Sequence, residues 1–221
     1  MLAKLNPQIE WHISCDPVDY AFAVEQMEIR AAAVARGQAS EYVWILEHPH
    51  IYTMGTSARD QDILQARCPV VRTGRGGQIT YHGPGQLIVY VILDLNKRGK
   101  DIRVYVQQLE QWVIETLAEM GISCQRRDGR VGLWVSRDNF HDDKIAAIGV
   151  RVKKWITLHG MSININPDLS YYQGIVPCGI RGHGVTSLSL LGWQGCVGDF
   201  QKNLQDAFIK NPYLNMGFSH L

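Results

Sequence analysis

The sequence has no close pair of cysteines. Its five cysteines are scattered along 221 residues without CxxC spacing: Cys15, Cys68, Cys124, Cys178 and Cys196. An odd and dispersed set argues against both a disulfide framework and a structural zinc site. In a reducing compartment each thiol is therefore expected to be either a small core residue or a reactive group.

The sequence also lacks an excess of one charge and any long apolar run. Its 22 basic and 21 acidic residues nearly cancel, which excludes a general attraction to nucleic acid or an anionic membrane. The apolar stretch at 87–95 is too short to cross a bilayer, and the first residues contain no apolar core of a signal peptide. We therefore expect a cytoplasmic protein with no nucleic-acid or membrane partner.

Internal repeats, low-complexity tracts and Pro/Ser-rich linkers are absent too, so we expect a single domain over residues 1–221. Apolar periodicity predicts helices at 18–36, 102–120 and 198–210, the second capped by Asp101 and ended by Gly121. Buried or alternating apolar runs predict strands at 41–49, 86–95, 131–136, 144–152 and 156–166. The last three are expected to be antiparallel and joined by short turns at 141–143 and 153–155. Helices separated by groups of sequential strands predict an α+β domain, with a mixed, largely antiparallel sheet flanked by helices.

The segment from Arg72 to Gln86 is unusually rich in glycine, with five glycines within residues 74–85. Such a density suits a backbone that approaches a ligand or adopts positive φ. The segment lacks the Gly-Lys-Ser/Thr of a phosphate-binding loop, and a strand rather than a dinucleotide-binding helix follows it. We interpret it as a ligand-binding loop, with a glycine-rich hairpin as the alternative.

Cys178 lies between a proline and a glycine, in a setting typical of a turn that presents a thiol. The alternative is a buried structural thiol, which is the usual role of a cysteine. A thiol with a pKa of about 8.5 needs a nearby cation or base to become a nucleophile at neutral pH. Lys144, at the start of an apolar strand, is the candidate, although an ordinary solvated lysine is the alternative. In a partly desolvated cleft its charge favours the thiolate, and a lowered lysine pKa lets it transfer protons.

The histidines leave other options open. His82, His159 and His183 each suit either a site or a structural role, whereas His48 and His50 lack an obvious third metal ligand. We therefore predict no metal site, and we assign structural roles to Cys124 and Cys196.

Four segments together resemble one enzyme family. EHPHIYTMG at 47–55, RGGQITYHGPGQ at 75–86, KIAAIGVRV at 144–152 and LHGMSININPDLSYYQGIVPCGI at 158–180 stand in the order and spacing of the lipoyl(octanoyl) transferases. The resemblance covers roughly residues 40–190. It departs at His50, where the family commonly has a second proline, and the stretch after about residue 195 matches nothing usable.

The resemblance implies a fold similar to the catalytic domain of biotin protein ligases and lipoate ligases. It implies transfer of an octanoyl or lipoyl group from acyl carrier protein to a lysine of a lipoyl domain, without a cofactor. The acceptors would be the lipoyl domains of 2-oxoacid dehydrogenase complexes and the glycine cleavage H protein, and the enzyme would be a monomer. By position, Cys178 matches the acyl-thioester cysteine and Lys144 the lysine that lowers its pKa. The implied substrate-binding residues are Arg75, Gly76, Gly77, Gln78, Ile79, Thr80, Tyr81, His82, Ala147, Ile148, Gly149, Gly160, Met161 and Ser162.

The implied mechanism is a ping-pong transfer through a Cys178 thioester. We expect Ala146, Ala147, Ile148 and Met161 to line an aliphatic cleft. We also expect backbone N–H groups near Cys178 or in a turn at 160–162 to stabilise the oxyanion. Arg151, Lys153 and Lys154 suit either a docking patch for acidic carriers or an ordinary solvated turn. The rival functions are an ATP-dependent ligase, a non-catalytic carrier-binding protein and a cysteine hydrolase.

Overall fold

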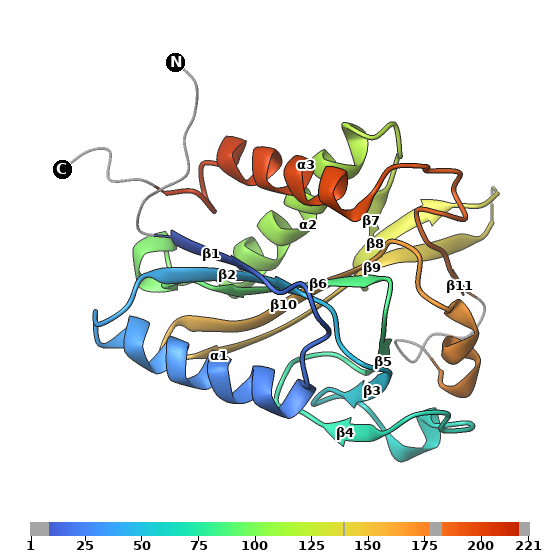
Figure 1. Ribbon diagram of the computed structural model, residues 1–221, viewed down its shortest axis with the longest axis horizontal. Coiled ribbons are helices and arrows are strands. Elements are labelled where there is room, and N and C mark those ends of the chain that lie inside the picture. The colour runs from blue at the N-terminus through green and yellow to red at the C-terminus, as the bar shows by residue number, and fades with distance from the viewer. Residues whose placement is uncertain (1–8, 139, 177–182, 217–221) are drawn as a thin grey trace.

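The computed structural model describes residues 9–138, 140–176 and 183–216, which form a mixed sheet with helices on both faces (Figure 1). The main sheet has eight described strands, in the order β1-β2-β6-β10-β9-β8-β7 with β11 beside β9. Only β1–β2 and β11–β9 are parallel pairs. These strands are β1 (Ile9–Ile13), β2 (Glu41–Leu46), β6 (Gln86–Ile92), β7 (Gln125–Arg127), β8 (Arg130–Ser136), β9 (Asp142–Lys153), β10 (Ile156–Asn164) and β11 (Gly184–Val185). The predicted mixed, largely antiparallel sheet is confirmed.

The antiparallel run β8–β9–β10 follows from alternating apolar residues joined by short turns. Lys154 and Trp155 connect β9 to β10 with φ angles of 51° and 65°. Positive φ at both positions is the geometry of a two-residue hairpin turn, so the predicted turn at 153–155 is confirmed. The turn predicted at 141–143 lies slightly earlier, because β9 already begins at Asp142.

One long helix covers one face of the sheet and two cover the other (Figure 1). These are α1 (Tyr20–Ala35) on the first face, and α2 (Ile102–Ala118) and α3 (Val197–Lys210) on the second. Asp19 and Asp101 cap the first two, since their carboxylates accept hydrogen bonds from the first-turn amides. The three predicted helices are therefore confirmed to within about two residues at each end, the uncertainty expected of helix boundaries.

A second, smaller sheet lies beside the end of α1 and was not foreseen in the sequence. It contains β3 (Ile51–Met54), β4 (Val70–Arg72) and β5 (Ile79–His82), in the order β4-β3-β5. Short 3₁₀ helices at Asp60–Asp62, Leu95–Arg98 and Leu169–Gly174 complete the described elements. Part of the predicted glycine-rich loop is therefore strand, because residues 79–82 pair with β3. This small sheet forms a roof over one end of the main sheet.

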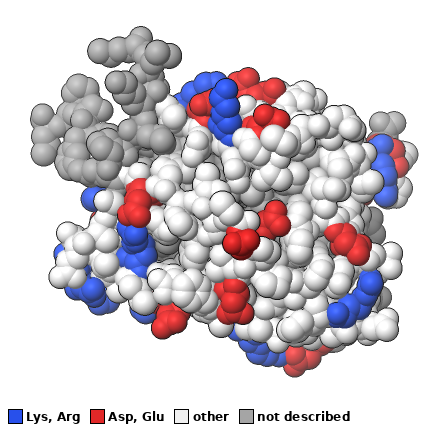
Figure 2. Space-filling view, viewed as in Figure 1, with Lys and Arg blue, Asp and Glu red and all other residues white. Residues whose placement is uncertain are grey.

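Surface charge follows the balanced composition. On the face seen in Figure 2, acidic and basic side chains are interspersed rather than gathered by sign. Within the described ranges, no helix is both long and apolar enough to span a membrane.

Candidate functional site

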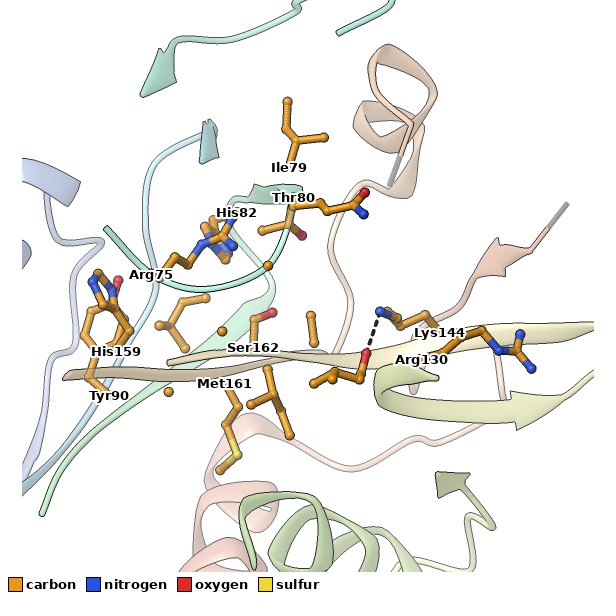
Figure 3. Close-up of a pocket in the computed structure, with 18 of the residues that line it drawn as sticks. Arg75, Ile79, Thr80, His82, Tyr90, Arg130, Lys144, His159, Met161 and Ser162 are labelled. Atoms are coloured by element: carbon orange, nitrogen blue, oxygen red, sulfur yellow. Dashed lines mark hydrogen bonds between the residues drawn. The ribbon is translucent and has the colours of Figure 1, made fainter. Parts of the chain in front are cut away.

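A cavity of about 200 Å³ lies where the small sheet meets the main sheet. Its floor comes from β6, β9 and β10, and its roof from β5 and the loop before it (Figure 3). The residues that line it are Tyr20, Arg75, Gly77, Gln78, Ile79, Thr80, His82, Ile88, Tyr90, Gly129, Arg130, Val131, Lys144, Ala147, Ile148, Gly149, His159, Gly160, Met161 and Ser162. Six segments, several of them far apart in the sequence, thus meet at one cavity.

Most of the residues expected to bind substrate lie at this cavity, but two do not. Gly76 and Tyr81 are absent from its lining. The Tyr81 side chain points into the core of the small sheet, where its hydroxyl lies 2.7 Å from His50 Nδ1 and its ring stacks on Tyr171. Alternation along β5 explains this, because Thr80 and His82 face the cavity while Tyr81 faces away.

The expected aliphatic cleft is partly wrong for the same reason. Met161 and Ile148 pack into the core under α2 and α3, on the opposite face of the sheet from the cavity. Figure 3 shows the Met161 side chain pointing away from Ser162. Ala147 and Ile148 are adjacent in the sequence and were both expected to line the cleft. Successive side chains of a strand point to opposite faces, so only one of the two can do so. Ala147 and Gly149 therefore form the cavity side of β9.

Lys144 stands at one end of the cavity, and a strand irregularity aims it there. The register between β8 and β9 shifts between Leu133 and Trp134, which inserts Ile145 as an extra residue. Such a bulge re-aims a side chain. Lys144 Nζ donates to the Val131 carbonyl at 3.0 Å and lies 4.6 Å from the centre of the Trp134 ring. The lysine is only 8% exposed.

Glycine at position 132 makes room for this lysine. Gly132 has φ of +107°, and a Cβ there would approach the Ala146 carbonyl to 2.7 Å and Lys144 Nζ to 3.3 Å. Its N–H donates to Glu110 Oε1 at 3.1 Å, and Glu110 in turn pairs with Arg126. The backbone beside Lys144 is thus fixed from α2.

A carboxylate and two arginines lie at the same end. Asp142 pairs with Arg127 and Arg130 at 2.6 and 3.0 Å. Hydrogen bonding to Arg127 holds the pKa of Asp142 at about 2, so this carboxylate is ionised at neutral pH. The Arg130 guanidinium also lies over the Trp134 ring, 4.8 Å from its centre. Trp134 therefore borders two cationic side chains.

The histidines at the other end of the cavity are neutral. Burial lowers the pKa of His82 to about 3 and the pKa of His48 and His159 to about 4. His48 donates from Nδ1 to the Val18 carbonyl, and its Nε2 lies 2.7 Å from the Tyr90 hydroxyl. Both ring nitrogens of His48 are thus satisfied within the fold, whereas His82 lines the cavity and stays a predicted substrate-binding residue.

A buried chain of hydrogen-bonded polar side chains runs behind the cavity, and no pattern in the sequence indicated it. His82 Nδ1 contacts Gln86 Oε1 at 2.6 Å, and Gln86 Nε2 donates to Asn164 Oδ1 at 2.8 Å and to the Tyr172 hydroxyl at 3.0 Å. Asn164 donates to the Thr186 carbonyl at 2.9 Å. The chain ties the roof of the cavity to the segment that follows β11.

Cys178 lies outside the described residues. Of the residues after it, Val185 pairs in register with Lys144, and the amide of Thr186 donates to the Lys144 carbonyl at 2.9 Å. His183 contacts Arg130, with Nε2 at 2.8 Å from the guanidinium, and lies against Trp134. The described chain just after Cys178 is therefore next to Lys144.

The oxyanion site expected at 160–162 is wrong as a turn. Gly160 to Ser162 form the middle of β10 and pair with β6 on one side and β9 on the other. Backbone groups paired on both sides belong to the sheet ladder. Gln78 supplies a hydrogen-bond acceptor instead, because its buried amide oxygen has no hydrogen-bond partner among the described residues.

The remaining expectations concern His50 and the basic turn. His50 stacks on Tyr171 with ring centres 4.5 Å apart. In the basic turn, Arg151 and Lys153 both pair with Glu28, at 2.7 and 3.0 Å. Glu28 therefore offsets one of the three positive charges of Arg151, Lys153 and Lys154. Within the described ranges, no three His, Cys, Asp or Glu side chains converge as metal ligands do.

Known proteins share both the sequence and the fold. Residues 19–209 match the family described as Lipoyl protein ligase A/B catalytic domain. A protein of Paramagnetospirillum magneticum named octanoyltransferase is 55% identical over 205 residues, covering 92% of this chain and 97% of its own. A lipoate-protein ligase A structure with bound ATP is 14% identical with a TM-score of 0.68, covering 96% of this chain and 88% of its own. Biotin protein ligase from Aquifex aeolicus is 12% identical with a TM-score of 0.51, covering 96% and 72%. The expected likeness to the ligase folds is confirmed.

Proposed function

The chain belongs to the lipoyl protein ligase A/B catalytic-domain family and to its octanoyltransferases, and on that premise we propose that it carries the octanoyl group as a thioester on Cys178. The donor is octanoyl-acyl carrier protein. The acceptor is a lysine on a lipoyl domain, as in 2-oxoacid dehydrogenase complexes or the glycine cleavage H protein. Lys144 is the proton carrier for both halves of the reaction.

The observation that carries the proposal is the placement of Lys144. A lysine buried at the end of a cavity is unusual, because lysine side chains are rarely buried and their burial is costly. The bulge at Ile145 and the glycine at 132 both lie beside this lysine. The strand that follows Cys178 runs beside Lys144, which favours a meeting of the two side chains.

In the first half-reaction the Cys178 thiolate attacks the thioester carbon of the acyl carrier. A tetrahedral oxyanion forms and collapses, and the C–S bond to the carrier breaks. The departing thiolate takes a proton from the Lys144 ammonium, which leaves Lys144 neutral. Exchange of one thioester for another is close to isoenergetic and needs no ATP.

In the second half-reaction the neutral amine of the acceptor lysine attacks the Cys178 thioester. The new C–N bond forms, the amine proton passes to neutral Lys144, and the Cys178 thiolate leaves. The enzyme returns to its starting state with the ammonium and the thiolate paired. Amide formation makes this half downhill.

The cavity beside Lys144 suits the octanoyl chain. Ala147, Gly149 and Gly160 leave space on its floor, and Ile88 adds apolar surface. Each CH₂ group buried there contributes about 0.8 kcal/mol. The unpartnered amide oxygen of Gln78 is an acceptor for an N–H group of the carrier arm or of the incoming lysine.

The test is intact mass spectrometry after the protein is mixed with octanoyl-acyl carrier protein in the absence of ATP. We expect one octanoyl adduct that hydroxylamine releases and that maps to Cys178. It should persist in the control Cys196→Ala, which removes an exposed thiol, and be lost in Cys178→Ala. No adduct with an intact carrier, or an adduct on another cysteine, would contradict the proposal. Full activity of Cys178→Ala with ATP and free octanoate would indicate a ligase instead.

A further inference from the structure

We propose that Tyr20 and His159 form the end wall of the acyl cavity and thereby set the length of acyl chain that the enzyme accepts. This inference rests on the proposed function, because it takes the cavity beside Lys144 as the place of the acyl chain. It assigns a specificity role to two side chains for which the sequence indicated none or left the role open.

A second cavity lies beyond this wall. It has a volume of about 500 Å³ and lies between the first turn of α1 and the small sheet. Tyr20 and His159 are the two residues that line both cavities. Figure 3 shows His159 at the opposite end of the first cavity from Lys144, with Ser162 between them. An acyl chain that enters at Lys144 therefore ends at these two side chains.

Two contacts hold the Tyr20 side chain in a fixed position. Its hydroxyl donates to Thr73 Oγ1 at 3.0 Å, and its ring lies edge-on to His48 with centres 5.2 Å apart. The residue is only 4% exposed although it stands at the first position of α1. The hydrogen bond joins α1 to the loop before β5, at Thr73, which lines the second cavity.

His159 reaches the cavity only through a strained backbone. By strand alternation it belongs on the same face as Met161, which packs under α2 and α3. Instead φ is +61° at His159, and its ring contacts Tyr90 on the cavity face. Positive φ in a non-glycine residue costs about 1–3 kcal/mol and is retained where function requires it.

The residue after His159 has no room for a side chain. A Cβ at Gly160 would lie 2.1 Å from the Val89 carbonyl of the adjacent strand, so only glycine fits. The His159 imidazole is neutral, because burial lowers its pKa to about 4. A neutral ring beside an aromatic one is a suitable end for an apolar chain.

The experiment measures chain-length preference directly. Octanoyl- and dodecanoyl-acyl carrier proteins compete at equal concentration for the wild type and for Tyr20→Ala, and mass spectrometry gives the ratio of the two acyl-enzyme adducts. Tyr20→Ala joins the two cavities, so the dodecanoyl-to-octanoyl ratio should rise by at least about tenfold. Tyr20→Phe keeps the ring and should leave the ratio near that of the wild type.

Two further variants make the result decisive. His159→Asn removes the ring while tolerating positive φ, and it should also raise the ratio. Tyr42→Ala is the matched control, since Tyr42 lies on the same face of the sheet but lines neither cavity. An unchanged ratio in folded Tyr20→Ala, or in His159→Asn if the former does not fold, would overturn the inference. Absence of any adduct on wild-type Cys178, with either chain, would instead reject the proposed function.

Discussion

The two faces of the main sheet differ in what they bury. Under α2 and α3 lies the main cluster of buried apolar and aromatic side chains, with Trp112 and Phe208 fully buried and in edge contact at 5.0 Å. The other face is apolar only beneath α1. Beyond the end of α1 it buries Lys144, His82 and Gln86 instead.

This difference separates stability from chemistry. Buried apolar area is the main source of folding free energy, whereas buried polar groups are kept only where they are hydrogen-bonded. The helix-covered face therefore stabilises the sheet, and the face under the small sheet holds the reactive groups. Substitutions on the helix-covered face should lower the free energy of unfolding, whereas substitutions under the small sheet should lower the rate of the reaction.

The largest expected effect is on the rate, at the cavity face. Lys144→Met removes the proton carrier but keeps most of the side-chain volume. We expect kcat for octanoyl transfer to fall by about 10²–10⁴-fold. The free energy of unfolding should change by only about 1 kcal/mol, the value of the hydrogen bond to the Val131 carbonyl.

Lys202→Met is the matched control, because Lys202 is an exposed lysine of α3. Its kcat should equal that of the wild type. If Lys144→Met retained more than about a tenth of wild-type kcat, general acid–base catalysis by Lys144 would be excluded.

The next effect is on stability, at the helix face. Trp112→Ala leaves a large cavity and removes the hydrogen bond from Nε1 to the Leu204 carbonyl. We expect a loss of about 3–5 kcal/mol in the free energy of unfolding, measured with denaturant. The activity of the folded fraction should be unchanged. The control Phe22→Ala, at an exposed position of α1, should stay within about 0.5 kcal/mol of the wild-type free energy of unfolding. A loss as large as that of Trp112→Ala would contradict the special role of the buried face in stability.

The smallest effect is a pH dependence that belongs to the cavity face. The folded pKa of His48 is lowered to about 4, whereas an unfolded histidine titrates near 6.5. Below pH 6.5 the unfolded chain binds a proton that folded His48 does not, so its stabilising contribution is lost as the pH falls from about 6.5 to about 4. The slope is at most about 1.4 kcal/mol per pH unit for one histidine.

Denaturant unfolding at pH 7, 6 and 5 measures this slope. His48→Gln should reduce it by the share of one histidine, since glutamine keeps a donor for the Val18 carbonyl without titrating, whereas His82 and His159 still contribute. His12→Gln, at an exposed histidine, should leave the slope unchanged. A slope that His48→Gln does not alter would show that this group titrates normally.

The local signals in the sequence were sufficient for most of the main sheet and all three long helices. Asp19 and Asp101 cap helices through short-range hydrogen bonds, and Lys154–Trp155 forms a two-residue turn. Such features depend on neighbouring residues, so a pattern reveals them. The small sheet was missed because β3, β4 and β5 are only three or four residues long and pair across distant segments.

The sequence predicted most of the residues that line the cavity, but not the directions in which their side chains point. The alternation of side chains along a strand places Met161 and Ser162 on opposite faces of the sheet, which excludes the Met161 side chain from the acyl pocket. No local rule reveals that a bulge at Ile145 turns Lys144, or that positive φ turns His159, because both depend on the adjacent strands. The link from Gln86 to Asn164 joins residues 78 positions apart and is equally invisible in the sequence.

The pairing of Lys144 with Cys178 is tested most directly by the pH dependence of cysteine alkylation, mapped by peptide mass spectrometry in the wild type and in Lys144→Met. We predict that Cys178 reacts with a midpoint below the ordinary thiol pKa of about 8.5 and that Lys144→Met raises this midpoint. Cys68 and Cys124, whose thiol pKa burial raises to about 11, should stay slow in both proteins. An ordinary midpoint for Cys178, identical in the two proteins, would contradict the account.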